Sequence, residues 1–164
     1  MLLESTVIIH RPPEVVSAYL GDPSKVVEWD RGVSRTEVRS DENPGVGFEF
    51  DTLAHPRGKD ARGEWGKMSY RIAAIDPDHG CTVQLTSTTG NARYFRTAEW
   101  RFRVEAVPEG SQVFCAADFV VRRRYFLLAP ILFFMKGAIQ KDLESLKRKL
   151  ENTQAEGTAH AGLA

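Results

Sequence analysis

The strongest constraint in this sequence is a two-residue periodicity close to the middle of the chain. In EWRFRVE (99–105), Trp100, Phe102 and Val104 alternate with charged residues. After the turn PEGS, the apolar residues of QVFCAADFVV (112–121) again occupy every second position. Successive side chains of a strand point to opposite faces, so this pattern predicts two strands with one apolar face and one wet face.

Other segments of the chain carry the same period. Four runs precede the hairpin, VSRTEVRS, GVGFEFDT, WGKMSYRIAAI and CTVQLTSTT, and STVIIH forms a first strand near the N-terminus. Short turns such as DPDHG join the six consecutive strands, which predicts an antiparallel meander. Between STVIIH and the meander, RPPEVVSAYLGD and PSKVVEWD predict two short helices, because proline suits a helix start and Gly21 a helix end.

The period changes to 3.6 after Pro130. A helix predicted from about 130 to 152 has one apolar stripe, with charged residues elsewhere. The stripe consists of Ile131, Met135, Ala138 or Ile139, Leu143, Leu146 and Leu150. The economical arrangement wraps a curved sheet around this helix and buries both apolar surfaces. NTQAEGTAHAGLA has lost the pattern, so 153–164 is expected to be a disordered tail.

Several segments in this order resemble the START-like superfamily, which includes polyketide cyclase/dehydrase, lipid-transport and birch-pollen-allergen-type proteins. The segments are VIIHRPPEVVSAYLGDPSKVVEWDRGVSRTEV with Trp29, RIAAIDPDHGCTV, EWRFRVEAVPEGSQV and LESLKRKLE. The resemblance covers residues 5–151. It implies one α+β domain over 1–152 with the helix-grip fold, in which a curved antiparallel sheet of about seven strands wraps around a long C-terminal helix and two short helices follow the first strand.

The same resemblance implies an internal cavity for a small hydrophobic molecule, lipid-like or polyketide-like. The apolar run Tyr125–Met135, beside three arginines, would then roof the cavity; the alternative is that it completes a solid core. The residues expected to contact the ligand are Tyr19, Trp29, Phe48, Phe50, Met68, Tyr70, Ile72, Tyr94, Trp100, Phe102, Phe119, Phe126, Phe133 and Phe134.

Whether the chain is an enzyme stays open at this point. Related cyclases and aromatases carry an inward-facing serine and arginine two positions apart, and Ser69 and Arg71 have that spacing. The alternation instead favours Met68, Tyr70 and Ile72 as the inner face, which would leave Ser69 and Arg71 in solvent. Tyr70 is a further weak catalytic candidate, because a buried hydroxyl can donate to a ligand carbonyl.

Composition restricts the possible partners. Lys plus Arg and Asp plus Glu are both 22, so no overall charge attracts nucleic acid. The four histidines and two cysteines have no metal-ligand spacing, and no cofactor motif occurs. Two lone cysteines and an N-terminus unlike a signal peptide predict a cytoplasmic protein.

The apolar run raises the question of membrane contact. Its eleven residues are too few to span a bilayer, which needs roughly 20. The adjoining run Arg122–Arg124, with Arg93 and Arg96, could instead form a basic rim that touches anionic lipid or the phosphate of a carrier protein. A membrane-surface lipid carrier is therefore a further alternative, and the sequence does not indicate an oligomeric state.

Overall fold

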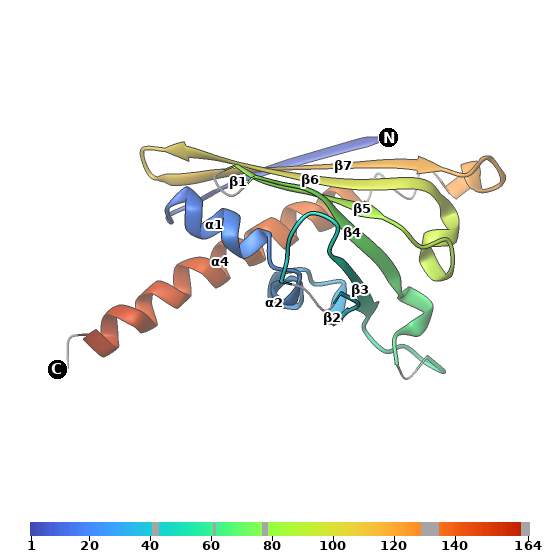
Figure 1. The fold of residues 1–164 in the computed structure, drawn as a ribbon, viewed down its shortest axis with the longest axis horizontal. Coiled ribbons are helices and arrows are strands. Elements are labelled where there is room, and N and C mark those ends of the chain that lie inside the picture. The colour runs from blue at the N-terminus through green and yellow to red at the C-terminus, as the bar shows by residue number, and fades with distance from the viewer. Residues whose placement is uncertain (41–42, 61, 77–78, 129–134, 162–164) are drawn as a thin grey trace.

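A computed structural model describes residues 1–40, 43–60, 62–76, 79–128 and 135–161, with the backbone alone at 91, 128, 135 and 154–161. One curved sheet lies over the helices (Figure 1). The elements are β1 Leu2–Ile9, α1 Pro13–Leu20, η1 Pro23–Lys25, α2 Val26–Trp29, β2 Val33–Val38, β3 Glu49–Ala54, η2 Glu64–Gly66, β4 Met68–Asp76, β5 Gly80–Leu85, η3 Gly90–Tyr94, β6 Phe95–Val107, β7 Gly110–Val121, η4 Arg123–Leu128 and α4 Met135–Ala161.

The described strands form a seven-stranded sheet in the order β1-β7-β6-β5-β4-β3-β2. All neighbours pair antiparallel, so the predicted meander is confirmed, and β1 adds to its far edge beside β7. In the β6–β7 hairpin, Trp100 lies opposite Ala117 and Phe102 opposite Cys115. The apolar residues predicted for the two strands therefore share the face of the sheet that the helices cover.

Gly110 closes this hairpin in a backbone conformation that favours glycine. Its φ is 136°, and a Cβ placed there would collide with the carbonyl oxygen of Ile9 at the end of β1. The turn can thus approach β1 closely, which lets β1 join the sheet along nearly the whole length of β7.

Helix α4 crosses the concave side of the sheet (Figure 1) and packs against β1 and α2. Ile139, Leu143, Leu146 and Leu150 are buried, so this part of the predicted stripe is confirmed. The predicted start near 130 falls in 129–134, outside the described residues. The helical backbone continues to Ala161, past the end of the apolar spacing near 152, and the division into a domain over 1–152 and a disordered tail stays a prediction.

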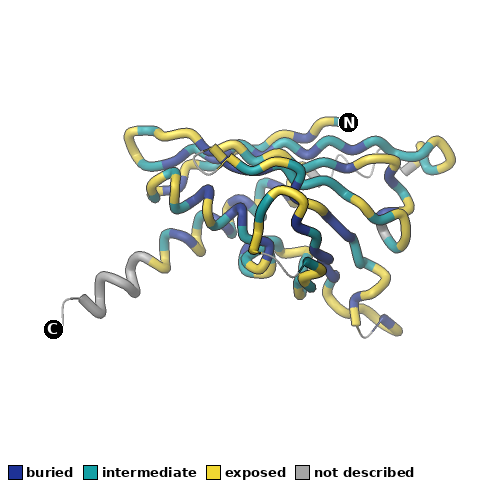
Figure 2. Tube along the Cα trace, viewed as in Figure 1, coloured by how far each residue is buried: buried dark blue, intermediate teal, exposed yellow. Residues whose placement is uncertain are grey.

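Burial follows the helix-grip arrangement. Buried and exposed residues alternate along the strands of the sheet (Figure 2). One hydrophobic cluster joins the helices to β1, β6 and β7, while Phe48, Phe50, Tyr70 and Ile72 form a second one on β3, β4 and the residue before β3. The expected α+β helix-grip fold is confirmed.

Candidate ligand-binding site

Aromatic rings from α2, β6 and β7 meet between the sheet and the helices. The Trp29 ring packs edge-on against Phe102, with centroids 5.9 Å apart, and Trp100 packs edge-on against Phe119 at 5.4 Å. Trp29 and Phe119 are buried, whereas Trp100 and Phe102 are only half-buried. The structure thus brings these four predicted ligand contacts together, and two of them keep accessible surface.

A second group of predicted contacts lies on β3 and β4. The Phe50 and Tyr70 rings stack at 5.7 Å, and Ile72 is buried beside them. The Tyr70 hydroxyl donates to Met68 Sδ at 3.5 Å, a weak acceptor. Burial, followed by the negative charge of Asp30, raises the pKa of Tyr70, so this hydroxyl stays protonated. Phe48 is also buried in this cluster.

Two carboxyl groups that the sequence did not single out lie where the turn after α2 meets α4. Asp30 Oδ1 accepts from the Gly32 amide at 2.8 Å, and Asp142 Oδ1 accepts from the Arg31 amide at 3.2 Å. Burial raises the pKa of Asp30. Burial, and then the charge of Asp30, raise the pKa of Asp142 from 3.8 to about 6.

The helical spacing of the sequence could have indicated that Asp142 faces the interior. It follows Ile139 by three residues and precedes Leu146 by four, so it lies on the apolar side of α4. Asp30 gave no such signal, because an aspartate at the end of a short helix is ordinary turn chemistry. An acid inside an apolar stripe is the feature that would have pointed to this site.

The remaining predicted contacts differ in burial, and Tyr19 and Tyr94 pack against the first hydrophobic cluster. Tyr19 is half-buried on α1, where burial and the neighbouring Glu28 carboxylate raise its pKa. Tyr94 stacks edge-on with Tyr125 at 5.0 Å. Phe126 was expected to close the cavity, but its side chain is 65% exposed because η4 turns it outward. The other two expected contacts, Phe133 and Phe134, lie outside the described residues.

Ser69 and Arg71 do not share the face of Tyr70. The register places Ser69 opposite Asp51 and Arg71 opposite Glu49. Arg71 is exposed, as the alternation predicts. Ser69 was also expected in solvent, and that was wrong: it is 7% exposed, because a polar network covers this part of the convex face.

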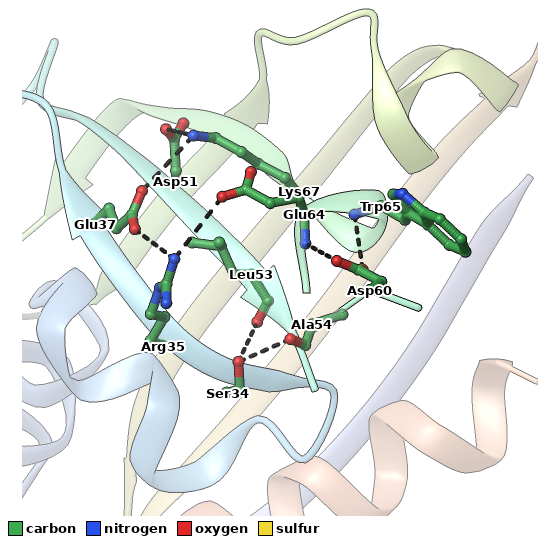
Figure 3. A network of polar contacts seen from close by, with 10 residues as sticks. All are labelled: Ser34, Arg35, Glu37, Asp51, Leu53, Ala54, Asp60, Glu64, Trp65 and Lys67. Carbon is green, nitrogen blue, oxygen red and sulfur yellow. Dashed lines mark hydrogen bonds and ion pairs between the residues drawn. The ribbon is translucent and has the colours of Figure 1, made fainter. Parts of the chain in front are cut away.

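That network is built around Asp51, which is 4% exposed. Lys67 Nζ lies 2.9 Å from Asp51 Oδ2, and Glu37 and Arg35 extend the chain of ion pairs over Leu53 (Figure 3). Burial acts to raise the pKa of Asp51, but Ser69 and Lys67 outweigh it and lower that pKa. Ser69 therefore belongs to a charge-compensated patch on the convex face.

The two cysteines are free and buried. Cys81 Sγ donates to the Leu20 carbonyl oxygen at 3.6 Å, and Cys115 lies opposite Phe102 in the hairpin. Burial raises the pKa of both thiols to about 12. Neither has the low pKa that a nucleophilic cysteine needs. Among the described residues, none of the helices is long and apolar enough to cross a membrane.

Several solved protein structures have the same fold as this chain. Its structure is similar to that of protein MLL2253 from Mesorhizobium loti (17% identity, TM-score 0.67, covering 93% of this chain and 98% of that one) and of TTHA0849 from Thermus thermophilus (18%, 0.66, 93% and 99%). It also resembles norcoclaurine synthase from Thalictrum flavum in complex with dopamine and hydroxybenzaldehyde (12%, 0.69, 93% and 87%).

A search of curated protein sequences gave no match. The family model described as "Polyketide cyclase / dehydrase and lipid transport" matches residues 2–151, nearly the whole of the described fold. The chain belongs to the polyketide cyclase/dehydrase and lipid transport family.

Proposed function

We propose that this protein binds one small hydrophobic molecule, lipid-like or polyketide-like, between the concave face of the sheet and helices α2 and α4. The observation that carries the proposal is the partial accessibility of Trp100 and Phe102 in the middle of that face. Their partners Phe119 and Trp29 are at least nine-tenths buried. A solid core would bury all four rings alike, so accessible surface here favours a hollow that a ligand can fill.

Polar atoms in this interior would orient the ligand. The indole N–H of Trp29 is buried and, within the described part of the chain, has no hydrogen-bond partner. Most buried polar groups in proteins are paired, so a donor of this kind favours a ligand that brings an acceptor. The Tyr70 hydroxyl, which donates to Met68 Sδ and also interacts with the Trp100 indole, is a second polar group in this interior.

A volume-filling substitution tests the proposal directly. Val83 is half-buried on β5 opposite Trp100, and Val83→Trp would place a large ring in the hollow. We expect this variant to fold with little loss of stability and to lose binding of an environment-sensitive apolar dye. Arg101→Trp, which adds the same ring at an exposed position on β6, is the matched control and should bind like wild type.

The proposal would be contradicted if Val83→Trp lost stability and the wild-type protein bound no dye. In a solid core, the added ring of Val83→Trp overpacks the interior and costs typically about 1–3 kcal/mol of unfolding free energy. These two results together would show that the interior is a solid core without space for a ligand. Mass spectrometry of an organic extract of the purified wild-type protein would identify the bound molecule.

A second candidate function is favoured by the placement of Asp142, a half-buried carboxyl on the inward side of α4 that lies near Asp30. Burial and the charge of Asp30 raise its pKa to about 6. A carboxyl that titrates near neutral pH can donate and accept protons, as general acid–base catalysis requires. We propose it as the acid–base group of a cyclase or aromatase-type reaction on a polyketide-like carbonyl compound. Ser69 and Arg71 take no part in this version, because they lie on the other face of β4.

The test uses a poly-β-keto thioester analogue and follows the ultraviolet absorbance of an aromatic product. Asp142→Asn should lower the rate at least about 100-fold while dye binding stays unchanged. If wild type and Asp142→Asn are equally slow, the chain binds such compounds without turning them over.

A further inference from the structure

The start of β6 and the residues that follow β7 form a surface that the ligand-binding proposal does not use. We call it the basic–apolar patch, and it consists of Arg96, Arg122, Arg123, Arg124, Phe126 and Leu127. Its four arginines line a surface depression of about 380 Å³. Phe126 is 65% exposed and Leu127 is 76% exposed, among the highest values for large apolar side chains in the described residues.

The patch rests on a defined support. The Arg122 amide donates to the Tyr94 carbonyl oxygen at 2.9 Å, and Arg122 Nε donates to the Phe95 carbonyl oxygen at 2.8 Å. The Tyr94 and Tyr125 rings pack edge-on, and the Arg124 guanidinium lies 4.8 Å from the centre of the Tyr125 ring. These contacts fasten η4 to η3, so the arginines and the two apolar side chains keep fixed relative positions.

The charges of this patch are not compensated within the part of the chain that the structure describes. The arginines that form ion pairs there are Arg35, Arg39, Arg101 and Arg103, and none of them belongs to the patch. Four neighbouring cations repel one another, and two adjacent large apolar side chains exposed to water are unfavourable. A partner that is anionic at its surface and apolar just beneath it removes both costs.

We propose that the basic–apolar patch docks the protein on a bilayer that contains anionic lipid. The arginines contact headgroup phosphates, and Phe126 and Leu127 enter the boundary between headgroups and acyl chains. A phosphate on a carrier protein would use the arginines but would leave the two apolar side chains in water, so the bilayer accounts for more of the patch. This inference goes beyond ligand binding and does not depend on it.

Vesicle co-sedimentation of the full chain tests the proposal. We expect binding to phosphatidylcholine vesicles that contain phosphatidylserine, weak or no binding to pure phosphatidylcholine vesicles, and loss of binding as salt is raised. Arg96→Glu with Arg123→Glu removes two exposed cations that form no ion pair within the described residues. Because each arginine near an anionic surface contributes roughly fivefold, the partition coefficient should fall at least about 25-fold.

Matched control variants distinguish the effect of the patch on vesicle binding from the effect of the protein's net charge. Lys59→Glu with Arg148→Glu makes the same charge change at exposed positions elsewhere, where screening weakens its effect, and should bind vesicles within about threefold of wild type. Phe126→Ser with Leu127→Ser keeps every charge and should lower binding roughly tenfold.

Three results would overturn the proposal. The first is no binding of wild type to anionic vesicles, and the second is equal losses in the two charge variants. The third is unchanged vesicle binding by the serine variant, which would show that the arginines alone bind the surface and that Phe126 and Leu127 do not enter the bilayer. Circular dichroism and dye binding of each variant show that fold and interior are intact, so failure of docking is distinguishable from failure of ligand binding.

Discussion

Asn in place of Asp142 should stabilise the protein at neutral pH and not at pH 4. Asp142 is half-buried on the inward side of α4, and its Oδ1 accepts from the Arg31 amide, a bond that the Asn oxygen can keep. Burial first, and then the negative charge of Asp30, raise its pKa from 3.8 to about 6. The folded protein therefore holds a proton at pH 5 that the unfolded chain releases.

The sign of the effect follows from proton linkage. A group with a raised pKa in the folded state contributes stability that is complete below pH 3.8 and is lost as pH rises through about 6. The difference between the two values corresponds to about 3 kcal/mol at most. Because water reaches part of this carboxyl, we expect about 1–2 kcal/mol after screening.

Urea denaturation at pH 4, 5, 6 and 7.5 measures the difference between wild type and Asp142→Asn. The unfolding free energy of the variant relative to wild type should increase by about 1–2 kcal/mol from pH 4 to 7.5, with most of the change between pH 4 and 6.5. A difference that is constant over this range would refute the raised pKa and, with it, the acid–base role of Asp142.

Other perturbations follow from the same structure. Leu146→Ala opens a cavity beneath the sheet and should lower the unfolding free energy by about 2–5 kcal/mol in urea denaturation, whereas the exposed Glu144→Ala should change it by under about 0.5 kcal/mol. Lys67→Met leaves the buried Asp51 carboxylate without its nearest cation and should cost about 1–3 kcal/mol at pH 7. The cost should shrink in acid, below the ordinary aspartate pKa of 3.8 from which the pKa of Asp51 is lowered. Cys81 and Cys115 should resist a thiol reagent at pH 8 and react completely in urea; fast reaction of the folded protein would contradict their burial.

The sheet could be predicted because its signal is local. Alternation along 99–105 and 112–121 determines which face of each strand is apolar, and short turns leave little choice of neighbour. The inward positions of Trp100, Phe102 and Phe119 follow from that pattern. The pairing of β1 with β7 joins distant segments, and no local pattern predicted it.

The errors arose where tertiary contacts override the local pattern. Alternation correctly placed Ser69 on the face opposite Tyr70, but it could not show that Asp51 and Lys67 would cover that face. Hydrophobicity suggested that Phe126 closes a cavity, yet hydrophobicity does not give the direction of a side chain in a 3₁₀ turn. The meeting of Asp142 with Arg31 depends on how α4 crosses the turn after α2, which no local pattern contains.

The environments of the Asp51 and Asp142 carboxyl groups differ, and the difference bears on the function of the protein interior. Where a carboxylate is buried on the convex face, a lysine lies 2.9 Å from it and the pKa of the carboxyl is lowered. Asp142 instead has a backbone amide as its hydrogen-bond partner and a second carboxyl nearby, and its pKa is raised. A leucine would fit the apolar stripe of α4 at lower cost in free energy. An acid held at that cost on the inward side of α4, next to a second carboxyl, favours a role toward a bound molecule over a role in packing.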